Sequence, residues 1–492
     1  MAKEINGIDK KNMESMSLKE FLLQTGLTTD ECTFDKISLE TELYEGVNLQ
    51  FPFIPAAMRS VTGYEMALEC AKNGMMAVIP CSMPIKEEVK IIKDVKSKEV
   101  KKGEIEFVEN PLTARPDDKF SYVLETKIKR YGHSTIPVID KFGRYLGTFI
   151  YTEPENFDMN NPMEKLIQYQ NRKKDLDFCL DSDDYEKIKK QLKKNGRRFM
   201  PIVDEQGHLI KLAFIRKIPS YLVAAGIDTH KEWERRAYPC VESGADMIFA
   251  DSSDGYNVFQ GKLIEKFKKR YPHIPFSGGN IITKEGFYYL ADCGADVVKI
   301  GMGIGSICTT SVVKGVGRGQ ATALIEIVDA RNEYYVRKGR YIPLIADGSI
   351  EGTHEMIIAL SIGADALMLG RYFNRFYEAA GQALDKEKRA TNDEEHICYK
   401  ETWGEGSPKA MSYRRYGHKT ARTAFAEGVV GMVDYAGRLK PNVERDALII
   451  KSSMSNAGCR NLKELREKAI LERMSPASTR DAYPHGLVEY MR

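Results

Sequence analysis

The amino-acid sequence predicts an α/β protein, a (β/α)8 barrel that is interrupted by a smaller α+β subdomain. Short apolar runs rich in β-branched residues alternate with longer amphipathic stretches, which is the pattern of parallel strands joined by helices. The triplet Gly-Ala-Asp occurs three times, each time just before such a run. Between the second and the third run lies a segment with a different pattern and an internal repeat.

Eight segments are predicted as strands of the barrel. Two lie early in the chain, at residues 53–58 and 75–80, with a predicted helix at 63–73 between them. Six more follow residue 220, at residues 221–227, 247–251, 275–280, 297–302, 342–347 and 366–370. Helices are predicted between several of these strands, at residues 283–293, 319–338 and 352–362. Eight strands is the number that closes a (β/α)8 barrel.

The Gly-Ala-Asp triplets lie where a predicted helix gives way to a predicted strand, at residues 244–246, 294–296 and 363–365. A glycine at such a junction can adopt the left-handed conformation that ends a helix. Three similar junctions favour a repeated βα unit.

The interruption, residues 104–218, contains two related pieces at 132–140 and 196–204. Each piece carries a proline, two Val or Ile residues and an aspartate, and a turn and a second apolar run follow. Such a repeat is typical of a paired α+β module, and two unrelated hairpins are the alternative. The predicted domains are residues 1–103 as the first part of the barrel, 104–218 as the insert, and 219–492 as the rest of the barrel with a long C-terminal segment.

Charge and cysteine content exclude several classes of protein. The net charge of +3 is too small to indicate a nucleic-acid or membrane-surface partner. No apolar run approaches the roughly eighteen residues of a membrane span, and the first residues lack a signal-peptide pattern. The nine cysteines are scattered and never form Cys-x-x-Cys, which argues against a disulfide framework and a zinc site. We therefore expect a cytoplasmic protein.

Glycine and polar residues follow five of the predicted strands, at 251–255, 278–280, 301–310, 347–349 and 370–371. In a (β/α)8 barrel the active site lies on the loops that follow the strands. The three glycines that begin the 301–310 loop suit a phosphate, which backbone amides can approach closely there, although a simple turn would also explain them. Arg371 could supply a charged fork to the same anion, and Asp251 and Asp347 could bind ribose hydroxyls or only cap helices.

Cys308 lies in the same loop, close to the hydroxyl side chains of Ser306, Thr309 and Thr310. Most free cysteines are small buried apolar residues, but hydroxyls and a glycine-rich backbone can favour a thiolate nucleophile. Residues 372–435, after the last predicted strand, are too many for a simple loop and suggest a flap over the catalytic face.

Together these motifs resemble the inosine-5′-monophosphate dehydrogenase family. The resemblance rests on the loop 303–310 and on residues 251–255, 278–280, 347–348, 368–371, 317–323 and 427–429, and it covers nearly the whole chain. The insert resembles a tandem pair of CBS domains.

The resemblance implies a two-stage reaction in guanine nucleotide biosynthesis. Cys308 would attack carbon 2 of the hypoxanthine ring of inosine monophosphate (IMP), and a hydride would pass to NAD. The covalent thioimidate would then be hydrolysed to xanthosine monophosphate (XMP), with Arg415 and Tyr416 on a mobile flap activating the water and Thr310 assisting. The family also implies a homotetramer and adenine or guanine nucleotides at the insert.

Other site residues follow from the resemblance position by position. Those that would bind the nucleotide substrate are Ser306, Asp347, Gly348, Ser349, Gly370, Arg371, Thr402, Glu405, Gly406 and Glu427. Those that would line the dinucleotide side are Asp251, Ser252, Ser253, Asn280 and Gly301. The backbone carbonyls that would contact a potassium ion are those of Gly303, Gly305 and Cys308.

The sequence departs from the family at several of these contacts. Thr402 stands in place of a phosphate-binding tyrosine, and Ser349 stands in place of a second glycine after the ribose-binding aspartate. Residues 481–483, Asp-Ala-Tyr, stand in place of the Glu-Gly-Gly that completes the potassium site from a neighbouring subunit. In the insert, Glu153 and Ile218 stand where an aspartate is expected.

Two other functions remain open at this point. A guanosine monophosphate (GMP) reductase, which deaminates GMP with NADPH, shares the barrel and the cysteine loop but normally lacks the Arg-Tyr pair. A nucleotide-sensing protein without catalytic activity would be expected to lose Cys308 or the flap. The presence of Cys308, Arg415 and Tyr416 favours the dehydrogenase.

Overall fold

The computed structural model describes residues 14–100, 103–131, 135–151, 158–170, 178–194, 199–216, 220–412 and 426–482. The chain divides into two compact units. The first comprises Met1–Lys98, Tyr221–Leu439 and Arg445–Arg492, and the second comprises Glu99–Ser220 and Lys440–Glu444.

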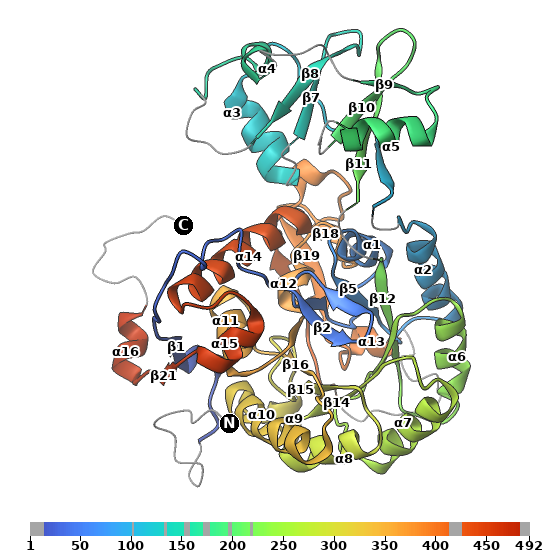
Figure 1. The fold of residues 1–492 in the computed structure, drawn as a ribbon. Coiled ribbons are helices and arrows are strands. Elements are labelled where there is room, and N and C mark those ends of the chain that lie inside the picture. The colour runs from blue at the N-terminus through green and yellow to red at the C-terminus, as the bar shows by residue number, and fades with distance from the viewer. Residues whose placement is uncertain are drawn as a thin grey trace. The chain divides into compact units, whose positions relative to one another are not determined.

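The first unit is built on eight parallel strands, which confirms the predicted (β/α)8 barrel (Figure 1). In chain order they are β4 (Phe53–Pro55), β5 (Met76–Ile79), β12 (Leu222–Ile227), β13 (Met247–Ala250), β14 (Phe276–Ile281), β15 (Val297–Ile300), β16 (Leu344–Asp347) and β17 (Ala366–Leu369). The first and last strands of the hydrogen-bonded order, β4 and β5, lie next to one another, and the sheet therefore curves into a barrel.

Helices connect the strands and cover the outside of the barrel (Figure 1). In chain order they are α1 (Tyr64–Lys72), α2 (Ile85–Ser97), α6 (Glu234–Glu242), α7 (Val258–Arg270), α8 (Lys284–Asp292), α9 (Thr310–Lys314), α10 (Gln320–Lys338), α11 (Thr353–Ile362), α12 (Arg371–Asn374) and α14 (Leu439–Asn456). No helix in the described ranges is long and apolar enough to cross a membrane.

The three Gly-Ala-Asp triplets share one structural role. Their glycines have positive φ angles of 97°, 100° and 141°, as predicted for these junctions. The aspartate that follows, Asp296 for example, donates its backbone N–H to the Phe276 carbonyl and accepts the Phe276 N–H on its carboxylate at 2.9 Å. Asp246 and Asp365 bond in the same two ways to the start of the preceding strand. Each carboxylate therefore satisfies a strand N–H whose loss would cost about 1–3 kcal/mol.

The barrel interior is apolar at one end, where a hairpin extends it. Strands β2 (Thr41–Tyr44) and β3 (Val47–Leu49) pair antiparallel, and their buried side chains join the same core cluster as Met247, Val297 and Ala366. Those three residues begin β13, β15 and β17, so the hairpin covers the amino end of the strands. The carboxyl end is left for the polar loops.

Beyond the barrel, the structure adds short elements from both ends of the chain. These are β1 (Phe21–Leu23), which pairs with β21 (Leu471–Arg473), the sheet of β18 (Ala383–Leu384), β19 (Tyr399–Trp403) and β20 (Val430–Asp434), and the helices α13 (Pro408–Ser412), α15 (Leu462–Lys468) and α16 (Pro476–Asp481).

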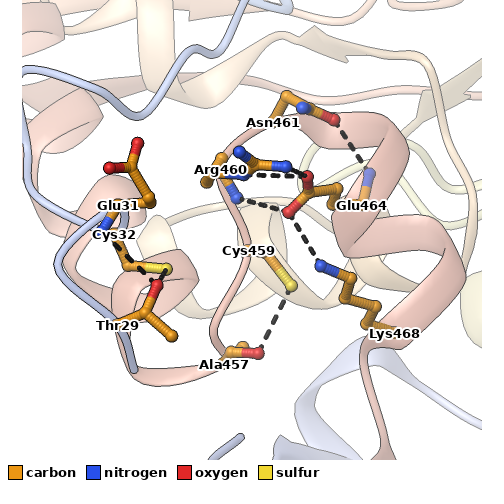
Figure 2. Close-up of polar contacts among 9 residues, drawn as sticks. All are labelled: Thr29, Glu31, Cys32, Ala457, Cys459, Arg460, Asn461, Glu464 and Lys468. Atoms are coloured by element: carbon orange, nitrogen blue, oxygen red, sulfur yellow. Dashed lines mark hydrogen bonds and ion pairs between the residues drawn. The ribbon is translucent and has the colours of Figure 1, made fainter. Parts of the chain in front are cut away.

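The N-terminal segment is bonded to the end of α14 and to the loop that follows it. Ser455 Oγ donates to the Cys32 carbonyl at 2.7 Å, and the Ser38 N–H donates to the Arg460 carbonyl at 2.8 Å. Beside this contact, Glu464 accepts from Arg460 at 2.6 Å and from Lys468 at 2.9 Å (Figure 2). These two cations lower the pKa of Glu464 to about 2.

The second unit is an α+β fold. Its strands are β6 (Ile105–Glu109), β7 (Thr135–Ile139), β8 (Tyr145–Ile150), β9 (Cys179–Leu180), β10 (Phe199–Val203) and β11 (Leu209–Ile215), and its helices include α3 (Phe120–Val123), α4 (Met163–Gln170) and α5 (Tyr185–Lys194). The two sequence repeats form the hairpins β7–β8 and β10–β11, each with a register shift at the same position. In their turns Asp140 and Asp204 each accept two backbone N–H groups. The repeats therefore have equivalent local structures.

Candidate active site

The loops at the carboxyl end of the strands surround a pocket with an empty volume of about 610 Å³. Of the ten residues that the sequence assigns to the nucleotide substrate, seven line this pocket: Ser306, Asp347, Gly348, Ser349, Gly370, Arg371 and Thr402. They come from loops that follow β15, β16 and β17 and from strand β19. The structure therefore brings together residues that are almost a hundred positions apart in the chain.

Asp347, at the end of β16, is held by two neighbouring strands. Its Oδ2 accepts from Asn280 Nδ2 at 2.9 Å and lies 3.4 Å from Lys299 Nζ. Asn280 Nδ2 also donates to the Gly301 carbonyl, and Asn280 Oδ1 accepts a hydrogen bond from Lys299 Nζ. The Asn280 side chain is therefore bonded to residues of the neighbouring strands and loops of the barrel. The bonds to Oδ2 leave Oδ1 of Asp347 as the acceptor for a ligand hydroxyl. Asn280, expected on the dinucleotide side, thus positions Asp347 in this structure.

Lys299 was missed by the sequence analysis. It is a buried lysine inside the apolar strand β15, with the sequence Val-Val-Lys-Ile. A buried ammonium requires partners, and a lysine in such a strand is the signal that could have identified it.

Glycine is required at the start of the cysteine loop. At Gly301 φ is +135°, and a Cβ atom would lie 1.9 Å from the Asp347 carbonyl oxygen. Ser349, in place of the family's glycine, also has a positive φ of 56°, and its hydroxyl donates to the Ile304 carbonyl at 2.8 Å. This bond ties the loop after β16 to the cysteine loop.

The charged end of the pocket carries an ion pair. Arg371 Nη1 lies 3.1 Å from Glu351 Oε2, and the Lys19 ammonium lies 3.4 Å from the same oxygen. Glu351 was not predicted as a site residue. An anion that binds Arg371 must therefore share it with, or take it from, this carboxylate.

Cys308 is bonded to the residue predicted to assist it. Its Sγ donates to Thr310 Oγ1 at 3.2 Å, and Thr310 Oγ1 donates to Glu427 Oε2 at 3.0 Å. The other oxygen of Glu427 lies 2.8 Å from Lys314 Nζ. A thiol, a hydroxyl and a carboxylate thus form a continuous path along which a proton can move away from sulfur.

A short backbone ladder fixes this path. Cys308 bridges antiparallel to Gly428, and the Thr309 N–H donates to the Glu427 carbonyl at 3.2 Å. Gly406 accepts the Glu427 N–H at 3.0 Å. Glu405 next to it accepts the Arg59 N–H on Oε1 at 2.6 Å. The three substrate residues outside the pocket lining, Glu405, Gly406 and Glu427, therefore lie together beside Cys308.

The residues predicted for the dinucleotide side lie around the ends of β13 and β14, except Gly301, which follows β15. Asp251 accepts a hydrogen bond from the Cys81 thiol at 3.1 Å, and the Ser252 hydroxyl donates to the Asp254 carbonyl at 2.7 Å. Ser253 is exposed. The backbone N–H of Asn280 donates to the Ser252 carbonyl, so these two loops are in contact.

Two of the three carbonyls predicted to bind potassium accept protein hydrogen bonds. Ser311 Oγ donates to the Gly303 carbonyl, and the Cys308 N–H donates to the Gly305 carbonyl at 3.0 Å. Within the described ranges, no group of three or more His, Cys, Asp or Glu residues could hold a metal ion.

Arg415 and Tyr416, predicted to activate water, lie outside the described residues, as do Glu153 and Ile218 of the insert. The described chain reaches Ser412 on one side of this segment and resumes at Ala426, next to Glu427.

Comparison with known proteins extends over the whole chain. The model of the IMP dehydrogenase / GMP reductase domain matches residues 15–485. A curated inosine-5′-monophosphate dehydrogenase of Tritrichomonas foetus is 35% identical and that of Aquifex aeolicus 31%, with 96–97% of this chain and 96% of each relative covered. The structure of a GMP reductase variant from Trypanosoma brucei in complex with guanosine 5′-monophosphate has a TM-score of 0.68 at 23% identity, covering 97% of this chain and 99% of that one.

Proposed function

Since the chain belongs to the IMP dehydrogenase / GMP reductase family, we propose that it oxidises IMP to XMP with NAD, in guanine nucleotide synthesis. The curated relatives at 31–35% identity carry the dehydrogenase name, and this supports the oxidative direction.

The observation that carries the proposal is the path from Cys308 through Thr310 to Glu427. A nucleophilic cysteine needs a route for its proton, and the two hydrogen bonds of 3.2 and 3.0 Å provide one. Ser306, two residues before Cys308, lines the pocket. A nucleotide with its phosphate in that pocket therefore has its base near the sulfur.

In the first stage, the sulfur of Cys308 forms a bond to carbon 2 of the purine while the C–H bond breaks. The hydride passes to the nicotinamide ring of NAD, which is the chemistry that this cosubstrate supplies. The thiol proton moves by way of Thr310 towards Glu427. Asp347, held by Asn280 and Lys299, accepts a hydrogen bond from a ribose hydroxyl.

In the second stage, water adds to the same carbon and the carbon–sulfur bond breaks, which releases XMP and regenerates the thiol. Before this step Glu427 releases the thiol proton to solvent. Arg415 and Tyr416 are proposed to activate the water, whose proton passes to Glu427 and then by way of Thr310 to the departing sulfur. Splitting one oxidation into two easier steps is the usual advantage of covalent catalysis.

On the dinucleotide side we propose that Asp251, Ser252 and Ser253 contact the cosubstrate. Ser253 is exposed and Asp251 is half-buried, so both are accessible to it. A potassium ion would contact the carbonyls of Gly303, Gly305 and Cys308. The first two already accept one hydrogen bond each, from Ser311 and Cys308, and keep a second lone pair for a cation.

The insert is proposed to act as a CBS pair that binds adenine or guanine nucleotides, and the chain is proposed to form a homotetramer. Two equivalent hairpins with equivalent aspartate turns support the paired module. Nucleotide binding to the purified chain and its mass in solution test these two proposals.

The decisive experiment mixes the purified protein with IMP and NAD and follows the absorbance of NADH. NADH should form, and Cys308→Ala should abolish both turnover and covalent trapping of the nucleotide. Cys398→Ala is the control, because Cys398 is an exposed cysteine on the β18–β19 connection.

The GMP reductase alternative gives the opposite result. No NADH at any potassium concentration, together with NADPH-dependent deamination of GMP, would refute the dehydrogenase. Neither reaction, with nucleotide binding retained, would point to a non-catalytic sensor.

A further inference from the structure

Asn374 lies in the wall of the pocket and was not singled out by the sequence analysis. It is the last residue of α12, the helix that starts at Arg371, and only 1% of its surface is exposed. Its Nδ2 donates to the hydroxyl of Thr402, a residue of β19 that is 2% exposed. Both residues line the pocket.

The Asn374–Thr402 pair has one hydrogen-bond donor that it does not use itself. Asn374 Nδ2 donates to the Thr402 oxygen, so the Thr402 hydroxyl hydrogen is directed away from Asn374. Asn374 Oδ1 is buried and accepts no hydrogen bond from the described residues. The pair therefore presents the Thr402 hydroxyl as a donor in the pocket wall.

The position of the pair is rigid. Around α12, Tyr372 packs edge-on against Phe373 and Phe376, and its hydroxyl donates to Asp446 at 2.8 Å. The Asn374 N–H donates to the Gly370 carbonyl at 3.0 Å. A side chain fixed in this way loses little entropy when a ligand binds.

Arg371, which also lines the pocket, is less well suited to hold an anion on its own. The Arg371 side chain is 47% exposed and is already paired with Glu351 at 3.1 Å. Solvent screens such a pair, whereas hydrogen bonds from buried neutral donors to an anion are strong. The buried wall formed by Asn374 and Thr402 is therefore the better-shielded source of donors.

We infer that Asn374 is a positioning residue for the substrate phosphate and acts through Thr402. Asn374 holds the Thr402 hydroxyl so that its hydrogen is directed to a phosphate oxygen. In this way a short threonine serves at the position where the resemblance implies a phosphate-binding tyrosine. The inference rests on the proposed function for the identity of the ligand as a nucleoside monophosphate.

The test measures binding of IMP and GMP by calorimetry, together with the Michaelis constants for IMP and NAD. Asn374→Ala should weaken binding of both nucleotides and raise the KM for IMP by about tenfold to a hundredfold, the range for one hydrogen bond to a charged group. The KM for NAD and kcat should change little. A purely structural defect would lower kcat or affect both substrates.

Four further variants sharpen the result. Thr402→Ser should bind like the original protein, Thr402→Val should match Asn374→Ala, and the double variant with Asn374→Ala and Thr402→Val should be no weaker than Thr402→Val. Asn374→Asp should be weaker than Asn374→Ala, because its carboxylate takes the Thr402 hydrogen and repels the phosphate. The control is Ser361→Ala, which removes another buried hydroxyl, in α11.

Equal nucleotide affinity of Asn374→Ala and the original protein would overturn the inference, and so would additive effects in the double variant. If Asn374→Ala does not fold, nucleotide affinities of Thr402→Val and Asn374→Asp equal to that of the original protein would overturn the inference instead. Failure of the proposed function has a different signature, since the original protein would then bind neither nucleotide or would form no NADH.

Discussion

Thr310 Oγ1 lies 3.2 Å from the sulfur of Cys308 and is at the same time the donor to Glu427, so one hydroxyl links the nucleophile to a carboxylate. Thr310 is buried in the first turn of α9, and Cys308 is bridged to Gly428. Helix α9 therefore holds Thr310, and the bridge to Gly428 holds Cys308.

Replacement of Thr310 should therefore slow the reaction more than it weakens binding. Thr310→Val keeps the shape but removes the hydroxyl, and we expect kcat to fall by about a hundredfold, the usual contribution of a positioned proton-transfer group. Thr310→Ser should retain most activity. Thr309→Val is the control, since no side-chain cap bond is formed by Thr309. Steady-state NADH formation measures all three, and normal kcat in Thr310→Val would contradict the proton path.

Arg415→Ala should separate the two chemical stages. We expect hydride transfer to be nearly unchanged and hydrolysis of the thioimidate to become much slower, because Arg415 is proposed to act only on water. Rapid-mixing measurements should then show a burst of NADH followed by slow turnover. Arg389→Ala, which removes an exposed arginine paired with Asp385, serves as control. If both stages slowed equally, the water-activating role would be wrong.

Gly301→Ala should disrupt the packing between the ends of β15 and β16. The new Cβ would overlap the Asp347 carbonyl at 1.9 Å in a backbone with φ of +135°. We expect a clear loss of thermal stability and of activity. Gly315→Ala is the matched control, because its φ is +69° and no atom lies within 4 Å of the added Cβ, so only the backbone cost of about 1–2 kcal/mol remains. Similar unfolding temperatures for the two variants, measured by calorimetry, would show that Gly301 is not sterically required.

Acid should weaken α15 through Glu464. Arg460 and then Lys468 lower the folded-state pKa of Glu464 to about 2, below its ordinary value of 4.5. As the pH falls below 4.5 the unfolded form takes up the proton first, so this stabilisation is complete above pH 4.5 and is lost as the pH falls towards 2. At neutral pH the α15 amides of Glu464→Gln should be less protected from hydrogen exchange than those of the original protein. This difference in protection should become smaller as the pH falls.

The exposed Glu467 on the same helix provides the control for that titration. Glu467→Gln should leave exchange and its pH dependence unchanged. A deficit in Glu464→Gln that stays constant down to pH 2 would mean that the carboxylate charge is not the source of the stability.

The sequence predicted the barrel well because its signals are local. Each of the eight strands lies within or overlaps its predicted segment, and the positive φ of Gly244, Gly294 and Gly363 follows from their place before a strand. Seven of the eight observed strands are shorter than predicted, since the chain turns as soon as pairing ends. After β4, for example, the Met58 N–H already donates to Ala56.

Contacts between residues that are distant in the chain could not be predicted from the sequence in the same way. Lys299, Asn280 and Asp347 meet because three strands are neighbours in the barrel, and no spacing in the sequence specifies that their side chains point inward. Asn374 and Thr402 are separated by a helix, a loop and a strand. The aspartate of each Gly-Ala-Asp triplet was noticed as a pattern, but its bond to the preceding strand became visible only in three dimensions.

The backbone hydrogen bonds beside Cys308 also join the residues on either side of positions 413–425. Residues before and after the segment 413–425 are bonded to each other, Gly404 N–H to the Val429 carbonyl at 3.0 Å and Glu427 N–H to Gly406. The described residues on the two sides of positions 413–425 are therefore hydrogen-bonded to each other. Because these bonds do not involve the intervening positions, a change in the number of residues between Ser412 and Ala426 should leave Gly406 and Glu427 in place beside Cys308.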